Sequence, residues 1–489
     1  MRFTAKRAAG SLTLALLLLA GCRAPDTAVS GGQTQPISSE SSAPALETDS
    51  ATAQQATGEG SAASSGASDK ETSATREAPL ATSKTTATTG KASQTAPKTE
   101  KTTETTTMPP VTYEDVKNVI RSEATDLRLT KNVLDRAIVN EGNAVRVANV
   151  IKKALRGEAV TIGFIGGSIT EGSAASSAAA NYVNRFRAWW SETFPNSSLS
   201  VCNAGKGATD SLMGVHRVET DLLTRNPDLV IVEFSVNDPD ERLYRETYEG
   251  LIRRILKQSN TPGVICLFMM NDSGANRAKL HQPVGEHYDL PIISYQEALW
   301  PSGGDKLYAW SEISPDNIHP NDTGHAIVSE LLIYYINTVR EKLTAIPETV
   351  NALPAPLTAS GYENALLLNS LNTKPVSLGS FYADAGTFQF GYGWTTNSGN
   401  NPFVLEVADA KNISILYKAS IDGAGAKATV KLDGKTVGTI DSDFSGGWGN
   451  YAGTFQVLEG TAAGKHRIEI QVNPEGSQNA FSILGILKS

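Results

Sequence analysis

The sequence predicts an α/β domain built on a parallel β-sheet with helices on both faces, followed by an antiparallel β-sandwich or jelly roll. Two patterns carry this prediction. Between Ala159 and Lys342, short uninterrupted apolar runs alternate with amphipathic segments, which is typical of parallel strands buried on both faces. From Thr358 to Ser489, short runs of alternating apolar and polar residues are separated by Gly- and Asn-rich stretches, which is typical of antiparallel sheets.

Five apolar runs are the expected strands of the parallel sheet. They are Val160–Gly166, Leu199–Asn203, Leu229–Phe234, Val264–Met269 and Pro291–Tyr295. The amphipathic stretches between them, and a last one that ends at Leu343, are the expected helices. In the second domain, the Asp-Gly pair at 433–434 predicts a tight hairpin turn between two strands.

The first 22 residues have the form of a secretion signal. Three basic residues among the first seven precede an apolar run at 12–20, which is too short to span a bilayer as a mature helix. The run leads into "LAGC", which resembles the bacterial lipobox, where cleavage precedes a cysteine that is then lipidated. We expect a lipoprotein whose residues 1–22 are the signal with its lipobox and whose only membrane attachment is the lipid on Cys22. The alternative is an ordinary secretory signal with an incidental cysteine.

Residues 23–110 are rich in Ser, Thr and Ala and contain no aromatic residue, so they cannot bury enough apolar surface to fold. We expect a disordered tether, with a mean span of about 50 Å, that holds the rest of the chain at the extracellular face of the cell membrane. The expected divisions after it are a helical lead-in (111–157), the α/β domain (158–345), a Pro-rich linker (346–357) and the sandwich (358–489).

Charge and cysteine content exclude several classes of protein. The net charge is −8 and no basic tract occurs, so we expect no nucleic-acid partner. Three cysteines do not make a disulfide framework, and Cys202 and Cys266 lie in apolar runs where buried free thiols are expected. We expect a monomer.

Polar residues suited to acyl transfer follow four of the predicted strands. In an open parallel sheet, functional groups collect beyond the carboxyl ends of the strands. The first strand leads into "GGS" (166–168), the second into "NAG" (203–205), the third into "SVND" (235–238), and a loop after the fifth contains "DNIHP" (316–320). These four segments are therefore expected to meet at one edge of the sheet.

Each segment offers one part of a serine hydrolase site. Ser168 is the candidate nucleophile, because a strand that turns sharply into a helix exposes its hydroxyl, and His319 is the base that this hydroxyl needs. Asp316 would orient the His319 ring and balance its charge. The Gly205 N–H and the Asn237 side-chain amide would donate, with the Ser168 N–H, to an oxyanion.

Each of these residues also has a structural interpretation. The "GGS" turn could cradle a phosphate, although no G-x-G-x-x-G or Gly-Lys-Ser/Thr motif is present. Asp238 is expected to cap the next helix together with Pro239 and Glu241. Asp316 alone would be a turn residue. The joint occurrence of these groups, in order and at successive strand ends, favours catalysis.

The remaining histidines of the α/β domain carry weaker signals. We expect His216 and His325 to be structural residues within helices. His281 and His287 are expected in a loop between Asn271 and Leu290 that would shape the cleft.

These motifs, in this order from Val160 to Leu343, resemble those of the SGNH (GDSL-like) hydrolases. The resemblance implies a three-layer flavodoxin-like fold and an enzyme that needs no metal or organic cofactor. It also implies the catalytic roles given above to four residues, namely Ser168, Gly205, Asn237 and His319. The chain has Gly167 where the family name has the aspartate of Gly-Asp-Ser, which identifies it with the members that carry Gly-Gly-Ser-Ile-Thr and leaves Ser168 as the nucleophile. Members of the family can also lack the acid that matches Asp316.

The setting favours a carbohydrate ester as substrate. A tethered enzyme with an attached sandwich is typical of polysaccharide-acting proteins, and no apolar lid is evident. We expect a secreted serine ester hydrolase that removes acetyl or other short acyl groups. The alternatives are an acyltransferase acting on a cell-surface glycan, and a non-catalytic glycan-binding or adhesion lipoprotein. Six aromatic residues of the sandwich could stack on sugars or fill its core: Phe388, Phe390, Tyr392, Trp394, Trp448 and Tyr451.

Overall fold

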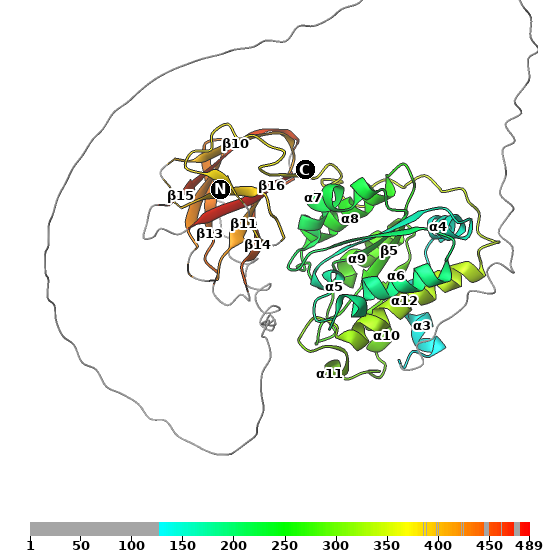
Figure 1. Ribbon diagram of the computed structural model, residues 1–489. Coiled ribbons are helices and arrows are strands. Elements are labelled where there is room, and N and C mark those ends of the chain that lie inside the picture. Colours follow the sequence, from blue (N-terminus) through cyan, green and yellow to red (C-terminus); the bar gives the residue numbers. More distant parts are fainter. Residues whose placement is uncertain are drawn as a thin grey trace, which may run out of the picture. The chain divides into compact units, whose positions relative to one another are not determined.

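The computed structural model describes residues 127–489 except 385, 388, 398, 400, 422, 424, 445–448, 461 and 474–479. The predicted signal, the tether and Cys22 lie outside the described residues. The described residues belong to one compact unit, in which an α/β part is followed by an all-β part (Figure 1). The predicted fold class is therefore confirmed.

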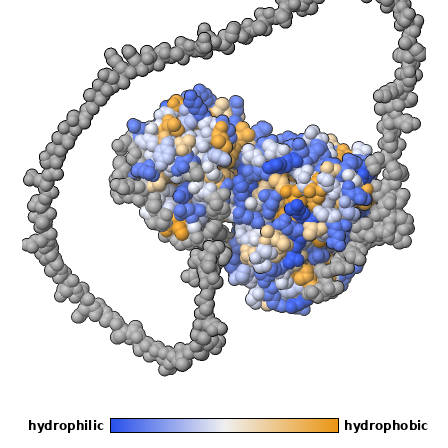
Figure 2. Space-filling model, in the orientation of Figure 1, coloured by the Kyte–Doolittle hydropathy of each residue, from blue (hydrophilic) through white to orange (hydrophobic). Residues whose placement is uncertain are grey.

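Within the described part of the chain, no helix is both long enough and apolar enough to cross a bilayer. Hydrophilic residues predominate on the face shown in Figure 2. The large apolar side chains that stay exposed all lie between Leu357 and Val437, in the linker and the sandwich.

The α/β part is built on one six-stranded sheet with the order β1-β6-β5-β4-β2-β3. Its strands are β1 (Ile138–Asn140), β2 (Val160–Gly166), β3 (Leu199–Gly205), β4 (Leu229–Glu233), β5 (Gly263–Phe268) and β6 (Ile292–Ser294). Strands β2 to β6 are parallel and match the five predicted runs, with β3 extended to Gly205.

Strand β1 was not predicted, because its segment reads as part of a helical lead-in. It is only three residues long and pairs antiparallel with β6, so that Ile138 lies opposite Ile293. A strand this short has no periodicity of its own, and its conformation depends on the partner that its backbone meets.

Helices cover both faces of this sheet, so that the α/β part has three layers: helices, sheet and helices. They are α3 (Lys131–Ala137), α4 (Val145–Leu155), α5 (Ser168–Glu171), α6 (Tyr182–Thr193), α7 (Ser211–Asp221), α8 (Arg242–Leu256), α9 (Ala278–His287), α10 (Tyr295–Leu299), α11 (Trp310–Ile313) and α12 (Asp322–Glu341), with short 3₁₀ turns η1 (Ala178–Ala180) and η2 (Leu223–Arg225). Helices α6, α7 and α12 each begin after an Asn or Asp whose side chain accepts a hydrogen bond from the first turn.

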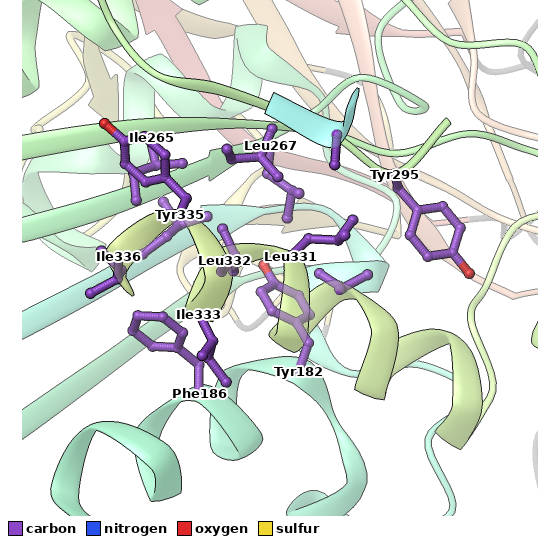
Figure 3. Packing of buried hydrophobic residues seen from close by; sticks show 14 of the residues in the cluster. Tyr182, Phe186, Ile265, Leu267, Tyr295, Leu331, Leu332, Ile333, Tyr335 and Ile336 are labelled. Atoms are coloured by element: carbon purple, nitrogen blue, oxygen red, sulfur yellow. The ribbon is translucent and has the colours of Figure 1, made fainter. Parts of the chain in front are cut away.

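The sheet separates two apolar clusters, because successive strand residues point to opposite faces. Phe164 and Ile231 pack with α3, α4, α6, α10 and α12, whereas Ile165 and Val232 pack with α7, α8 and α9. Figure 3 shows part of the first cluster, with side chains from α6, α12 and β5. The predicted burial of both faces is thereby accounted for.

The all-β part contains two antiparallel sheets. One has the order β10-β15-β12-β13 and the other the order β14-β11-β16-β9-β8, with β7 also paired to β16. The strands are β7 (Leu366–Leu368), β8 (Tyr382–Asp384), β9 (Gly393–Thr396), β10 (Phe403–Ala410), β11 (Ile413–Ala419), β12 (Lys427–Leu432), β13 (Lys435–Asp441), β14 (Tyr451–Leu458), β15 (Gly464–Val472) and β16 (Phe481–Lys488). The predicted hairpin joins β12 to β13, and its turn residues Asp433 and Gly434 both have positive φ.

The sandwich shares an apolar core with the α/β part. Phe390 and Leu484 belong to the same buried cluster as Leu212 of α7 and Leu251 of α8. Phe390 and Trp394 are buried, so these two aromatic residues serve packing, whereas Tyr392 is 54% exposed. Tyr451 is half-buried and packs edge-on against a neighbouring aromatic ring. Phe388 and Trp448 lie outside the described residues.

Gly142 and Gly303 both have positive φ, but only Gly142 is closely packed against other atoms, so alanine at these two positions should cost different amounts of stability. Gly142 has φ +59°, and a Cβ there would lie 2.4 Å from the Leu290 carbonyl carbon. Gly303 has φ +75°, and a Cβ there would meet no described atom within 4 Å. Gly303→Ala should therefore lower the free energy of unfolding by about 1–2 kcal/mol, and Gly142→Ala by about 3 kcal/mol or more, because overpacking adds to the strain.

Urea unfolding of the two variants and the wild type measures this difference. Equal losses of unfolding free energy would mean that the backbone around Leu290 relaxes and that the close approach has no energetic weight.

Candidate active site

Ser168, His319 and Asp316 form a hydrogen-bonded line at the carboxyl edge of the sheet. Ser168 is the first residue of α5, directly after β2, and His319 lies in the loop before α12. The Ser168 Oγ lies 2.8 Å from His319 Nε2, and His319 Nδ1 lies 2.8 Å from Asp316 Oδ2. Although 151 positions separate the serine from the histidine, the structure brings the three predicted groups together.

Asp316 determines which ring nitrogen of His319 is basic. Its other oxygen, Oδ1, accepts from the N–H groups of Ile318 and His319, at 2.8 and 2.7 Å. Burial alone would raise the pKa of Asp316, but hydrogen bonds from the His319 ring and from these N–H groups outweigh it and hold that pKa at about 2. An ionised carboxylate only accepts, so Nδ1 carries the proton and Nε2 is left to accept from Ser168.

Gly205 does not present the open donor that the sequence predicted. It is the last residue of β3, and its N–H donates to Asn203 Oδ1 at 2.9 Å. Its lack of a side chain serves packing instead, since a Cβ there would lie 2.2 Å from the Glu171 nitrogen. The prediction failed because β3 continues two residues beyond Asn203 and the Asn203 side chain folds back on it.

Gly207 offers a second N–H in the loop that follows β3. It donates to Glu171 Oε2 at 2.8 Å, and Glu171 is exposed one turn after Ser168 in α5. Rotation of this exposed side chain would free the Gly207 N–H for another acceptor. The signal in the sequence was the second glycine in "NAGKGA", which is equally compatible with a turn.

Asn237 lies directly against the glycine turn that precedes Ser168. A Cβ on Gly167 would lie 2.5 Å from Asn237 Oδ1 and 2.7 Å from Nδ2, so a side chain at 167 would require the Asn237 amide to move. Asn237 Oδ1 is buried and has no hydrogen-bond partner among the described residues. The role of the Asn237 amide as an oxyanion donor stays a prediction.

Asp238 has a different role from the predicted helix cap. The next helix, α8, begins after Glu241, whereas Asp238 Oδ1 accepts from the Ser211 N–H at 2.7 Å and Oδ2 lies 2.8 Å from His281 Nε2. His281 was expected in a loop, but it lies in α9, fully buried and stacked on Tyr248. Asp238 therefore ties the Asn237 loop to two helices, through partners that the sequence does not place near it.

The other histidines of the α/β part do not belong to the hydrogen-bonded set of Ser168, His319 and Asp316. His216 and His325 are buried and hydrogen-bonded to backbone groups, as expected of structural residues. His287 ends α9 and contacts the Ala355 carbonyl in the linker. The expectation that the 271–290 segment is a cleft-shaping loop was therefore wrong for its second half.

Glu233 is a buried carboxyl beneath the Ser168 turn that sequence reasoning missed. It ends β4, and its Oε2 accepts from the Thr170 hydroxyl at 3.1 Å. Burial raises the pKa of Glu233 to about 7, although the Thr170 hydroxyl and the Gly167 N–H favour its charged form. The available signal was a lone acidic residue at the end of an apolar run, which the strand prediction absorbed.

This arrangement is suited to attack by an activated hydroxyl on an acyl carbon. It combines a serine, a base whose tautomer is fixed, and amide donors on neighbouring loops.

Across the residues that the structure describes, no group of three or more His, Cys, Asp or Glu side chains could hold a metal ion.

Comparisons with a family model and with solved structures each give matches. The model of the GDSL-like lipase/acylhydrolase family matches residues 164–327. A solved two-domain esterase active on acetylated mannans is 32% identical with a TM-score of 0.69, and the match covers 73% of this chain and 98% of that one. A structure of such an esterase co-crystallised with mannopentaose is also 32% identical, with a TM-score of 0.67 and coverage of 73% and 97%. No curated protein matches the chain.

The raised pKa of Glu233 predicts a pH dependence of stability. Its value in the folded protein, about 7, lies above its ordinary value of 4.5, so its contribution to stability is complete below pH 4.5 and is lost as the pH rises through 7. Glu233→Gln should reduce the fall in unfolding free energy between pH 5 and pH 8 by on the order of 1–3 kcal/mol.

Urea unfolding at both pH values measures this effect. Burial also raises the pKa of Asp210 to about 7, so part of the slope should remain in the variant. A variant with the same pH dependence as the wild type would contradict a titrating Glu233.

Proposed function

The chain belongs to the GDSL-like lipase/acylhydrolase family and is an SGNH-type ester hydrolase, and from this premise we propose that it removes acetyl groups from a carbohydrate, specifically from an acetylated mannan. The observation that carries the catalytic part is the 2.8 Å hydrogen bond between Ser168 Oγ and His319 Nε2. The substrate is supported by the likeness to the two-domain esterase active on acetylated mannans, because the match extends over nearly all of that chain.

The first half of the reaction acylates Ser168. His319 Nε2 accepts the hydroxyl proton while Ser168 Oγ attacks the acetyl carbonyl carbon, and the Asp316 carboxylate stabilises the resulting imidazolium. The carbonyl oxygen gains negative charge and accepts from the Ser168 N–H and the Asn237 amide, joined by the Gly207 N–H once Glu171 turns away. The imidazolium then gives its proton to the sugar oxygen as the carbon–oxygen bond breaks.

The second half releases acetate. His319 takes a proton from a water molecule, whose oxygen attacks the acetyl-Ser168 carbonyl carbon. The same N–H groups donate to the carbonyl oxygen as it gains negative charge. The Ser168 oxygen leaves and takes the proton back from His319, so that the enzyme is restored.

We further propose that the enzyme is displayed outside the cell. The support is the apolar run followed by "LAGC" and the long polar segment at 23–110. A diacylglyceryl group on Cys22 would hold the chain at the membrane. The tether would let the catalytic domain reach polysaccharide away from the bilayer surface.

Substitution of Ser168, His319 or Asp316 tests the catalytic proposal. Ser168→Ala and His319→Ala should each lower kcat by at least about 10⁴-fold, because either change removes the activated nucleophile, and Asp316→Asn should lose less. The measurement is acetate released from acetylated mannan by the purified protein. A Ser168→Ala protein that retains more than a hundredth of the activity would refute the assigned nucleophile.

Two controls separate the outcomes of that experiment. Acetylated xylan under the same conditions should release acetate more slowly, and a faster release would overturn the mannan assignment while leaving the esterase activity intact. Product analysis in the presence of an unacetylated mannan detects transfer of acetyl to the sugar instead of to water.

Replacement of Cys22 tests the anchor. Cys22→Ala should move the protein from the membrane fraction to the soluble extracellular fraction, because no residue remains to carry the lipid. Fractionation of cells that express each form, with mass spectrometry of the mature N-terminus, gives the result. A variant that stays in the membrane fraction would contradict lipidation at this residue.

A further inference from the structure

Arg217 is a buried cation next to the two strand ends that lead into the site. It lies on α7, and only 1% of its surface is exposed, which is rare for arginine unless it is fully paired. Nη1 donates to the Ala204 carbonyl at 2.6 Å, and Nη2 donates to the Gly166 carbonyl at 3.0 Å. Nη2 also lies 3.3 Å from the Thr209 hydroxyl. The Arg217 guanidinium therefore contacts the end of β2, the end of β3 and the loop after β3, which meet at the edge of the sheet where Ser168 lies.

The two carbonyls that Arg217 holds belong to adjacent strand ends. Gly166 of β2 pairs with Gly205 of β3, and Ala204 is the preceding residue of β3. The first strand end continues through Gly167 into Ser168, and the second continues into the loop that contains Gly207 and Thr209. The fork of the guanidinium is planar and rigid, so it sets the distance between its acceptors.

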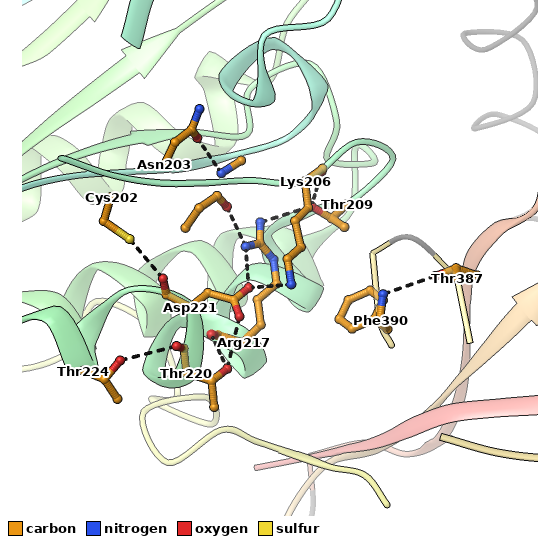
Figure 4. Close-up of polar contacts among 12 residues, drawn as sticks. Cys202, Asn203, Lys206, Thr209, Arg217, Thr220, Asp221, Thr224, Thr387 and Phe390 are labelled. Atoms are coloured by element: carbon orange, nitrogen blue, oxygen red, sulfur yellow. Dashed lines mark hydrogen bonds and ion pairs between the residues drawn. The ribbon is translucent and has the colours of Figure 1, made fainter. Parts of the chain in front are cut away.

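The Asp221 carboxylate balances the positive charge of the buried Arg217 guanidinium. Its Oδ2 lies 3.0 Å from Arg217 Nη1 and 2.9 Å from Lys206 Nζ, so the loop after β3 joins the same network (Figure 4). A buried charge without a partner would be strongly destabilising. With its charge balanced, the guanidinium uses Nη1 and Nη2 on backbone carbonyls, while its buried Nε has no hydrogen-bond partner among the described residues.

We propose that Arg217 is a positioning residue for the reaction, which holds the Ser168 turn and the 206–209 loop at a fixed separation. The inference rests on the proposed function. Arg217 does not touch the reacting atoms; it acts through Gly166, Ala204 and Thr209. The nucleophile lies on one of the segments it holds and the Gly207 donor on the other, so a change in their separation displaces both relative to a bound acyl group.

Arg217→Lys tests this role because it keeps the charge beside Asp221 but replaces the fork by a single ammonium. That group cannot reach both carbonyls with the same geometry. A misplacement of about 1 Å at a catalytic group costs on the order of 100-fold in rate, so kcat for p-nitrophenyl acetate should fall about 10- to 100-fold. KM should change less than about twofold, because the groups that bind the substrate remain.

Arg254→Lys is the matched control. Arg254 lies on the neighbouring helix α8 and also donates to two backbone carbonyls, those of Val215 and Ala365, and pairs with the Glu219 carboxylate. These contacts lie away from the strand ends. Its substitution should lower stability while leaving kcat unchanged, so it measures what the loss of such a network does on its own.

Both variants are compared per active molecule, with reactive Ser168 counted by complete labelling with a fluorophosphonate. Wild-type kcat per labelled site in Arg217→Lys, or a loss no greater than in Arg254→Lys, would overturn the positioning role. If Arg217→Lys does not fold, Thr209→Val removes one acceptor, and it should lower kcat several-fold; an unchanged kcat would overturn the proposal.

Failure of the proposed function would look different. A wild-type protein that neither hydrolyses p-nitrophenyl acetate nor reacts with the fluorophosphonate would refute the function itself. An active wild type whose kcat is insensitive to Arg217 refutes only the positioning role.

Discussion

The parallel register of the central sheet is the constraint on which the site depends. Gly166 of β2 lies beside Gly205 of β3 on one side and Glu233 of β4 on the other, so three strands end at one level. Parallel strands all deliver their carboxyl ends to the same edge, and the segments that leave it are forced into proximity. The Ser168 turn, the 206–209 loop and the Asn237 loop all begin at this level. His319 completes the site from the loop before α12, which packs on α6 across the first apolar cluster.

Polar groups in the interior support the catalytic edge from below. Glu233 lies under the Ser168 turn, Arg217 under the ends of β2 and β3, and Asp238 under the Asn237 loop. Buried polar groups are costly unless their partners are well placed, so each of them restricts the backbone that it contacts to few alternatives. Buried polar side chains stabilise this region less than apolar ones would, but they hold the backbone of the site in one geometry. This is the pattern expected where a sequence departs from an ideal apolar core.

The sandwich belongs to the same structural unit as the catalytic sheet. Its residues enter the apolar cluster of α7 and α8, and Gln389 donates to the Gly207 carbonyl at 3.0 Å. Lys206, in the same loop, lies over the Phe390 ring. These contacts agree with a match to a two-domain esterase that covers nearly the whole of that chain. Phe390 is therefore held by packing and is not available as an exposed stacking surface.

The sequence by itself determined the fold class, the five parallel strands, and the presence of Ser168, Asn237, Asp316 and His319 beyond strand ends. Those conclusions rest on the period of apolar residues, which is a local property, and on the rule that uninterrupted apolar strands separated by helices run parallel. Only the tertiary structure decided the pairings outside the predicted Ser168–His319–Asp316 set. It placed Asn203 on the Gly205 N–H, joined Arg217 to carbonyls of two strands, brought His281 to Asp238, and turned three residues before Gly142 into an edge strand. Hydrogen-bond partners drawn from segments far apart in the chain leave no periodic trace, because the energy of such a contact depends on where the rest of the fold puts each group.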